Sequence, residues 1–133
     1  MDWNKAHEYA EKHTTKPSLL LREIEEDTRE NVGQINMLSG HLQGRFLSLI
    51  SKLQNPKYIL EVGTFTGYAT ICMAEGLQED GEMHTVEKNP NLEEKLKNSF
   101  FVHMYTKIKC IAMLCSKKSK IWAENIMAKN GFL

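Results

Sequence analysis

This sequence lacks most of the features that would assign it at once to a class of protein. It has three cysteines in 133 residues and no Cys-x-x-Cys pair, which argues against a disulfide framework and for a reducing compartment. Basic and acidic residues number 17 each, so no excess charge favours nucleic acid or an anionic membrane as partner. There is no apolar run of membrane-spanning length and no apolar signal core at the start. We therefore expect a cytoplasmic protein that binds neither nucleic acid nor membrane.

Apolar and charged residues are balanced as in an ordinary globular domain. Hydrophobic residues make up 41% of the chain and charged residues 26%, which predicts a single domain over residues 1–133. Residues 1–56 are expected to be helical, with helices at Trp3 to His13, after an N-cap at Ser18, and at Gly40 to Leu53. The last helix has a broad apolar face that we expect in the core, formed by Leu42, Phe46, Leu47, Leu49, Ile50 and Leu53.

The pattern changes at Tyr58 to strands that alternate with helices. We expect strands at 58–62, 82–87 and 107–114, a turn at 63–67, and helices at 68–77 and from Asn89-Pro90 to about Met104. This order is the βαβαβ half of a doubly wound fold. The sequence thus predicts an α/β protein in which N-terminal helices precede a partial, Rossmann-like parallel sheet of about three strands. We assign residues 57–115 to this cofactor-binding half and residues 116–133 to a divergent tail.

The turn after the first predicted strand carries the clearest sign of a ligand site. Gly63 follows the strand directly and Gly67 opens the next helix, at the strand ends where ligands bind in open α/β sheets. A dinucleotide loop has a glycine where this chain has Phe65, so the loop favours a nucleoside without pyrophosphate. Glu61 is placed to attract a cationic group, and Glu87 ends the second strand, where a carboxylate accepts both hydroxyls of a ribose. The alternative is a tight turn beside a solvated glutamate.

These stretches together closely resemble the cation-dependent O-methyltransferases, the group of catechol and caffeoyl-coenzyme A O-methyltransferases. The strongest likeness is the turn itself, Glu61-Val62-Gly63-Thr64-Phe65-Thr66-Gly67-Tyr68-Ala69-Thr70. Thr85 to Pro90 is similar to the family's ribose-binding strand end, and Met37 to Gly44 resembles the loop and helix start that cover the cofactor. The helical N-terminus also matches, and the resemblance spans roughly residues 15 to 111.

The resemblance implies that the cofactor is S-adenosylmethionine and that its methyl group passes to a hydroxyl of a small aromatic, catechol-like acceptor. It also implies which residues surround the methionine part of the cofactor. Glu61 and Gly63 would contact this part, and Phe65 and Ala69 would line the same pocket. The loop glycines, the bulky Phe65 and the acid at the strand end are all consistent with that assignment.

The other implied contacts come from the N-terminal segment and from the second strand. Met37 and Ser39 would close the pocket from the N-terminal side. Glu87 would hold the ribose hydroxyls, and Lys88 would lie beside the adenine. Members of the family also use a divalent metal, usually magnesium, which binds both acceptor oxygens and lowers the pKa of the hydroxyl.

The likeness to the family ends after Ile111. The family's metal-binding aspartates have no counterpart, because the chain has no aspartate after Asp80, and the remaining strands of the usual seven are missing. We therefore predict a relative truncated at its C-terminus, as a frameshift or an early stop would give, and we assign no metal ligand and no catalytic residue. The chain is then either an O-methyltransferase or a non-catalytic protein that binds cofactor or a partner. A nicotinamide-dependent oxidoreductase is disfavoured by Phe65.

The remaining reactive residues suggest no second site. The five histidines include no pair at i, i+4 spacing, and Lys117, Lys118 and Lys120 fit a solvated helix start better than a phosphate site. A sheet this short leaves an exposed strand edge, and a net charge near zero weakens self-repulsion. We therefore expect a homodimer.

Overall fold

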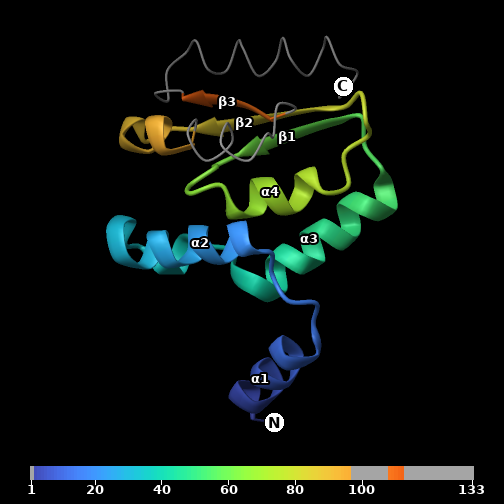
Figure 1. Ribbon diagram of the computed structural model, residues 1–133, viewed down its shortest axis with the longest axis vertical. Helices are drawn as coiled ribbons and strands as arrows, with labels where there is room; N and C mark the ends of the chain where they lie inside the picture. Colours follow the sequence, from blue (N-terminus) through green and yellow to red (C-terminus); the bar gives the residue numbers. More distant parts are fainter. Residues whose placement is uncertain (1, 97–107, 113–133) are drawn as a thin grey trace.

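The structure is a computed structural model that describes residues 2–96 and 108–112. Helices lead into three parallel strands, and the α-helices labelled α2, α3 and α4 lie on one face of that sheet (Figure 1). This arrangement confirms the predicted α/β class with a partial, doubly wound sheet. The division at residue 56 stays a prediction, and the tail 116–133 and the predicted helix beyond Leu96 lie outside the described residues. In the described part, no helix has the length and apolarity that a membrane crossing requires.

The first two helices begin at polar caps. Helix α1 (Trp3–His13) follows Asp2, whose side chain accepts hydrogen bonds from two backbone N–H groups of the first turn. Helix α2 (Leu19–Asp27) follows Ser18, whose hydroxyl accepts from the Leu21 N–H at 3.3 Å. The predicted cap at Ser18 is therefore confirmed.

Two short helical turns link α2 to the third helix. The π-helical turn η1 (Thr28–Val32) continues directly from α2, and the 3₁₀ turn η2 (Ile35–Met37) follows it. Their hydrogen-bonding patterns differ from that of an α-helix, so the chain changes direction between α2 and α3 without a long irregular loop. This change brings residues 37–39 to the ends of the strands, beside the bend that follows the first strand.

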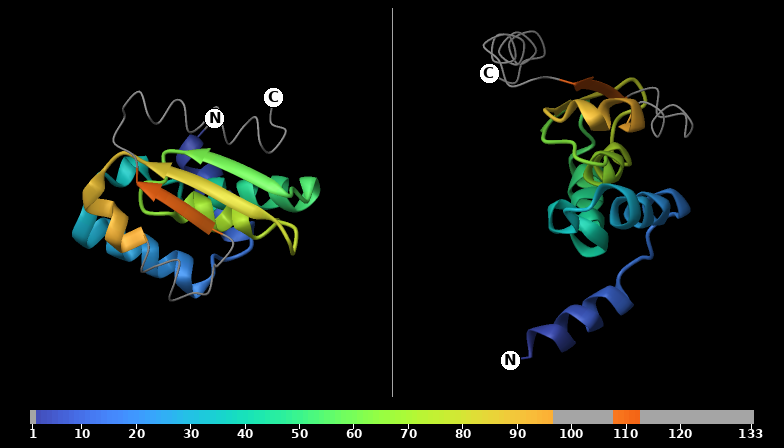
Figure 2. Two further views of the ribbon diagram at one scale, coloured as in Figure 1. Left: turned by 90° about the horizontal axis from the view of Figure 1, so that it is seen from above. Right: turned by 90° about the vertical axis from the view of Figure 1, so that its left-hand side faces the viewer.

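The sheet has the order β1-β2-β3, with all strands parallel. Strands β1 (Tyr58–Val62) and β2 (Glu82–Glu87) have the predicted bounds. Strand β3 (Ile108–Ala112) lies within the third predicted strand, and the rest of that predicted range lies outside the described residues. Parallel neighbours require a crossover, and helix α4 (Tyr68–Ala74) provides the one between β1 and β2 (Figure 2). A short 3₁₀ turn η3 (Pro90–Leu92) follows β2. In this register Glu61 lies opposite Thr85, so the ends of β1 and β2 are adjacent.

Helix α3 (Gly40–Gln54) packs closely on α4 through small side chains, in a contact we call the α3–α4 seam. The buried members of α3 are Gly44, Ser48 and Ser51. A methyl group at Gly44 would lie 2.6 Å from the Tyr68 ring, and one at Gly76 would overlap the backbone of Ser51 and Lys52. The close approach explains why α4 ends at Ala74 rather than at the predicted Leu77, since the chain must turn at Gly76 to pass α3.

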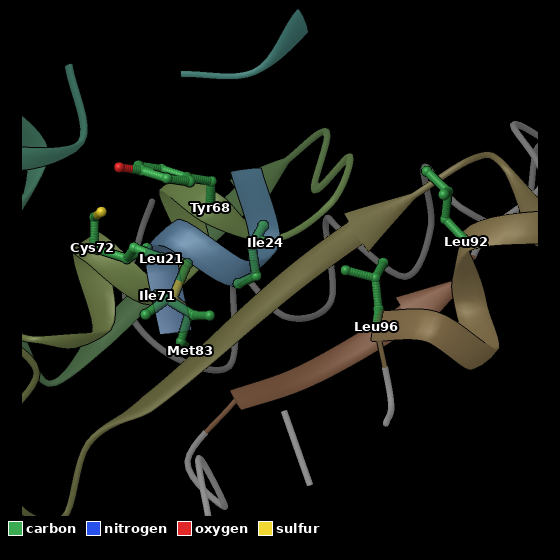
Figure 3. Close-up of a cluster of buried hydrophobic side chains, with 8 residues drawn as sticks. All are labelled: Leu21, Ile24, Tyr68, Ile71, Cys72, Met83, Leu92 and Leu96. Atoms are coloured by element: carbon green, nitrogen blue, oxygen red, sulfur yellow. The ribbon is translucent and has the colours of Figure 1, made fainter. Parts of the chain in front are cut away.

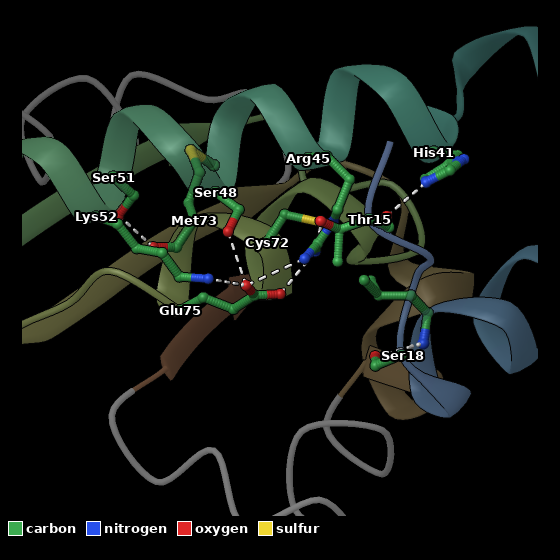
Figure 4. Close-up of polar contacts among 11 residues, drawn as sticks. Thr15, Ser18, His41, Arg45, Ser48, Ser51, Lys52, Cys72, Met73 and Glu75 are labelled. Atoms are coloured by element: carbon green, nitrogen blue, oxygen red, sulfur yellow. Dashed lines mark hydrogen bonds and ion pairs between the residues drawn. The ribbon is translucent and has the colours of Figure 1, made fainter. Parts of the chain in front are cut away.

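An ion pair crosses this seam. Arg45 donates to Glu75 at 2.6 Å, Lys52 lies 2.7 Å from the same carboxylate, and the Ser48 hydroxyl donates to it at 2.7 Å (Figure 4). Burial alone would raise the pKa of Glu75, but these three hydrogen bonds outweigh it and hold the pKa at about 2. Glu75 is therefore ionised at neutral pH and fixes the position of α4 along α3.

The apolar core lies between α2, α4 and the sheet (Figure 3). It extends past the end of β2 to the turn and helix start that follow. Its members are Leu21, Ile24, Tyr68, Ile71, Cys72, Met83, Leu92 and Leu96. Burial of about eight large side chains drives the helices onto the sheet, at roughly 1.5–3 kcal/mol for each aliphatic one.

The apolar face expected in the core on α3 is mostly outside it, so that prediction is wrong. Four of its members are exposed, namely Phe46, Leu49, Ile50 and Leu53. Only Leu47 of this face packs against the core, and Leu42 is half-buried. The reason is that the small residues of the seam allow a closer helix contact than bulky residues would, so α3 turns its small side inward.

Candidate cofactor site

A tight bend joins β1 to α4 at the ends of the strands. The backbone N–H groups of Gly63 and Thr64 both donate to the Val86 carbonyl, at 2.9 and 3.2 Å, which ties the bend to β2. Gly63 has φ of +100°, a value that glycine adopts without strain. A side chain there would meet nothing within 4 Å, and Val62 is 80% exposed, so the space over the end of β1 is open.

Glu87, at the end of β2, holds the same bend through hydrogen bonds from backbone N–H groups. Its Oε2 accepts from the Phe65 N–H at 2.7 Å, and its Oε1 accepts from the Asn89 N–H at 2.8 Å. These bonds fix the plane of a carboxylate that is only 6% exposed, and they help to hold Phe65 at a φ of +51°. Each oxygen keeps a lone pair, so the carboxylate retains the capacity to accept one hydroxyl on each oxygen.

Glu61 is the last residue but one of β1, and the hydrogen bonds that its carboxylate accepts from the described residues come from neutral groups. Thr70 of α4 and Thr85 of β2 donate to its Oε2, at 2.6 and 2.5 Å. Burial raises the pKa of Glu61 above its ordinary value, the two hydroxyl bonds lower it in part, and the charge of Glu87 raises it further. A cationic group placed near this carboxylate would favour its ionised form.

Threonine hydroxyls connect the bend to its surroundings. Thr64 and Thr85 share a hydrogen bond of 2.5 Å. Since the single proton of Thr85 goes to Glu61, Thr64 must be the donor of this bond. On the other side, Thr28 in η1 contacts Thr66 at 2.9 Å, which links the bend to the segment after α2.

Two hollows lie beside the bend. The first has a volume of about 40 Å³, and Met37, Leu38 and Ser39 form its outer wall; it is also lined by Gly63, Thr64, Phe65, Thr66, Tyr68 and Ala69. The second has a volume of about 570 Å³ and is lined by Gln34, Asn36, Met37, Lys88 and Asn89. Met37 borders both, so the two hollows meet at this side chain.

The structure brings the eight predicted cofactor residues to this one region. Five of them line the small hollow, namely Met37, Ser39, Gly63, Phe65 and Ala69. Lys88 lines the larger hollow, while Glu61 and Glu87 lie beneath the bend. Their contact with a cofactor stays a prediction. The sequence reasoning missed the role of Thr70 and Thr85 in positioning Glu61, although strand alternation places Thr85 on the same face as Glu87.

The resemblance implies a divalent metal, for which no ligand was assigned from the sequence. Across residues 2–96 and 108–112, no group of three or more His, Cys, Asp or Glu side chains is arranged to hold a metal ion. The two acids at the bend are hydrogen-bonded to threonine hydroxyls and to backbone N–H groups instead. The described residues therefore do not fit the metal that the resemblance implies.

The cofactor, in contrast, has suitable partners here. A nucleoside that carries positive charge fits three features of this region. They are the open space over Gly63, the two acceptor oxygens of Glu87, and the carboxylate of Glu61, whose hydrogen bonds to described residues come from neutral groups. Comparison with known proteins gives the family of the chain. A family model described as O-methyltransferase matches residues 11–121, and the chain belongs to this family.

Individual relatives match over part of their length. The chain is 41% identical over 70 residues to a caffeoyl-CoA O-methyltransferase of Populus kitakamiensis, and 48% identical over 48 residues to a catechol O-methyltransferase of Niastella koreensis. These matches cover 52% and 36% of this chain. The chain spans only 30% and 22% of the length of the two relatives.

Solved structures share the fold over most of the chain. The SAH-bound methyltransferase PaMTH1 of Podospora anserina matches with a TM-score of 0.80 and 25% identity, covering 90% of this chain and 52% of its own. The O-methyltransferase TomG of Streptomyces achromogenes, in complex with SAM, matches with a TM-score of 0.73 and 25% identity, covering 84% and 52%. The chain therefore corresponds to about half of each of these structures.

Proposed function

We propose that this chain binds S-adenosylmethionine at the bend between β1 and α4, as part of an O-methyltransferase that acts on a small aromatic hydroxyl. The observation that carries the proposal is the Glu87 carboxylate, which two backbone N–H groups hold beside the open space over Gly63. Family membership and the ligands named for two structural neighbours support the choice of cofactor.

The two acids divide the recognition between them. Glu87 presents two neighbouring oxygens at a fixed spacing, which suits the two vicinal hydroxyls of a ribose. Glu61 accepts its hydrogen bonds from neutral hydroxyls within residues 2–96, so it is suited to a positively charged part of the cofactor. When bound, the sulfonium of the cofactor supplies an electrophilic methyl group. The small hollow requires the wall at Met37 to Ser39 to move outward as the cofactor enters.

Calorimetric titration tests the cofactor site. We expect S-adenosylmethionine to bind, and Glu87→Gln to weaken binding by at least about 100-fold, or about 2.7 kcal/mol, because an amide cannot accept both hydroxyls. Glu82→Gln makes the same change at the other end of β2 and should leave the affinity unchanged. Equal affinity in the Glu87→Gln and wild-type proteins would overturn the proposal.

The acceptor is proposed to be a catechol-like aromatic, on the strength of the names of two relatives. The test is methyl transfer from radiolabelled cofactor to catechol, with and without magnesium. Transfer that Glu87→Gln abolishes supports an enzyme. The family's magnesium has no fitting ligand set in the described residues, so no step is assigned to it.

The second candidate is a non-catalytic protein that binds cofactor or a partner. The lack of a metal-holding group among the described residues favours it. Cofactor binding with no transfer to catechol, at any magnesium concentration, would select this candidate over the enzyme. The expectations of a homodimer and of a cytoplasmic location belong to the same proposal for either candidate.

A further inference from the structure

Three buried threonines form a set of hydrogen bonds that ends on the Glu61 carboxylate, which we call the threonine clamp. Thr64 of the bend, Thr70 of α4 and Thr85 of β2 are 3%, 0% and 0% exposed. Thr70 and Thr85 donate to Oε2 of Glu61 at 2.6 and 2.5 Å, and Thr64 donates to Thr85. The three residues come from separate parts of the fold, so the clamp forms only when strand, bend and helix are assembled.

The clamp treats the two oxygens of this carboxylate unequally. Oε2 accepts two O–H bonds, which occupy both of its lone pairs, so it carries no proton while both bonds are in place. Oε1 accepts no hydrogen bond from residues 2–96 or 108–112. The clamp therefore fixes the plane of the Glu61 carboxylate and leaves Oε1 as the oxygen that can accept from a ligand.

The clamp also preserves the negative charge of Glu61. A carboxylate that is only 9% exposed needs hydrogen-bond donors to remain ionised. A lysine or an arginine in this place would supply donors and would also cancel the charge. Hydroxyls stabilise the anion and add no positive charge, so the attraction for a cation is kept.

We propose that Thr70 and Thr85 are positioning residues that give the cofactor site its preference for a positively charged ligand. They act through Glu61, whose Oε2 they hold while Oε1 receives the cationic part of the cofactor. This inference rests on the proposed function and adds to it the groups that set charge selectivity. The part assigned to Glu87 is different, because the ribose that it would hold is common to charged and neutral nucleosides.

Calorimetric titration with two ligands tests the clamp. S-adenosylmethionine carries a net positive charge, whereas 5′-methylthioadenosine has the same adenosine part and no charge. Thr70→Val and Thr85→Val should each weaken binding of S-adenosylmethionine about 10-fold, because a buried carboxylate that loses a donor takes up a proton or turns away. The affinity for methylthioadenosine should change less than about 2-fold. Serine at either position keeps the hydroxyl and should restore most of the lost affinity.

Two controls separate charge selectivity from a general effect on the fold. Thr28→Val removes another fully buried hydroxyl near the bend, one that bonds to Thr66 and to the Ile24 carbonyl. It should leave the ratio of the two affinities unchanged. In a Glu61→Gln background, Thr85→Val should have no further effect on that ratio, as expected if it acts through the acid. Urea unfolding confirms that each variant is folded under the titration conditions.

Several outcomes would overturn the role given to the threonines. Equal weakening for both ligands would indicate a purely structural role. Valine variants that bind S-adenosylmethionine as the wild type does, serine variants that behave like valine, or an altered ratio in Thr28→Val would also contradict it. The proposed function stands in each case if Glu87→Gln weakens the binding of methylthioadenosine. A wild type that binds neither ligand overturns the proposed function, and this inference with it.

Discussion

Two carboxylates in this fold, Glu61 and Glu75, show how differently one chain treats buried negative charge. Glu75 lies in the α3–α4 seam, where Arg45 and Lys52 hold its pKa at about 2. Glu61 lies at the end of β1, where burial raises its pKa and its hydrogen-bond donors are two neutral hydroxyls. The first charge is neutralised within the chain and stabilises the fold. The second receives hydrogen bonds from neutral hydroxyls among the described residues, and we propose that a cationic part of the cofactor binds beside it.

The largest effect is expected at the seam itself. Gly76→Ala would push a methyl group into the backbone of Ser51 and Lys52, so α3 and α4 would have to separate. We expect a loss of about 3 kcal/mol or more in the free energy of unfolding, measured in urea. Gly33→Ala is the control, because a side chain there meets nothing within 4 Å, so only its backbone conformation, with φ of +73° and ψ of −159°, adds strain, about 1–3 kcal/mol. Equal losses at the two positions would contradict the steric explanation.

The next largest effect tests how Glu75 is neutralised. Arg45→Met removes the strongest partner of a carboxylate whose side chain is 22% exposed. We expect a loss of about 2–3 kcal/mol, less than for a fully buried pair. Lys57→Met removes an exposed pair with Asp80 and should leave the urea midpoint almost unchanged, because solvent screens that pair. If both variants unfold at the same urea concentration, the seam ion pair contributes no more to stability than the exposed pair does.

The pH dependence of stability tests the same ion pair between Arg45 and Glu75. The pKa of Glu75 is lower in the folded chain, about 2, than its ordinary value of 4.5. Its contribution is therefore present above pH 4.5 and is lost as the pH falls toward 2. Thermal unfolding from pH 6 to pH 2 should show a smaller decline in Arg45→Met than in the wild type. An identical decline would place the acid sensitivity elsewhere.

The smallest effect on stability, with the opposite sign, is expected at Glu61. Its pKa is higher in the folded chain, so its ionisation costs stability as the pH rises from 4.5 through the raised value. Glu61→Gln should raise stability at pH 7 and weaken binding of S-adenosylmethionine. We expect the wild type to lose affinity on acidification as Glu61 takes up a proton, and Glu61→Gln should remove this pH dependence. A variant that is less stable at pH 7, yet binds normally, would refute the role given to this acid.

The sequence predicted the strands and the bend well because their signals are local. Tyr58–Val62 is a short apolar run between turn residues, and Gly63 marks where the chain reverses. The packing of α3 was not predictable in the same way. A helix with bulky apolar residues on one side and Gly44 and Ser48 on the other gives no sign of which side faces the core. Which side of α3 faces the core depends on the shape of α4, and the hydrophobic pattern of α3 gives no information on that shape.

The candidate site was partly predictable for a related reason. Parallel strands end at one edge of a sheet, so the proximity of Glu61 and Glu87 follows from topology. The hydroxyl bonds from Thr70 and Thr85 depend on the register of β1 against β2 and on the position of α4, and the sequence specifies neither. Threonine is also common in strands for reasons unrelated to ligands, so its presence carried no signal.

The bond from Glu87 to the backbone of Phe65 has a consequence for the history of such proteins. One acid is both the candidate ligand group and, through its bond to the Phe65 N–H, a support for the shape of the bend. A lineage that had given up methyl transfer would still gain stability from this acid, because it holds the bend in place. The motif would then outlast the chemistry, and its survival in a descendant would record the architecture of an ancestor.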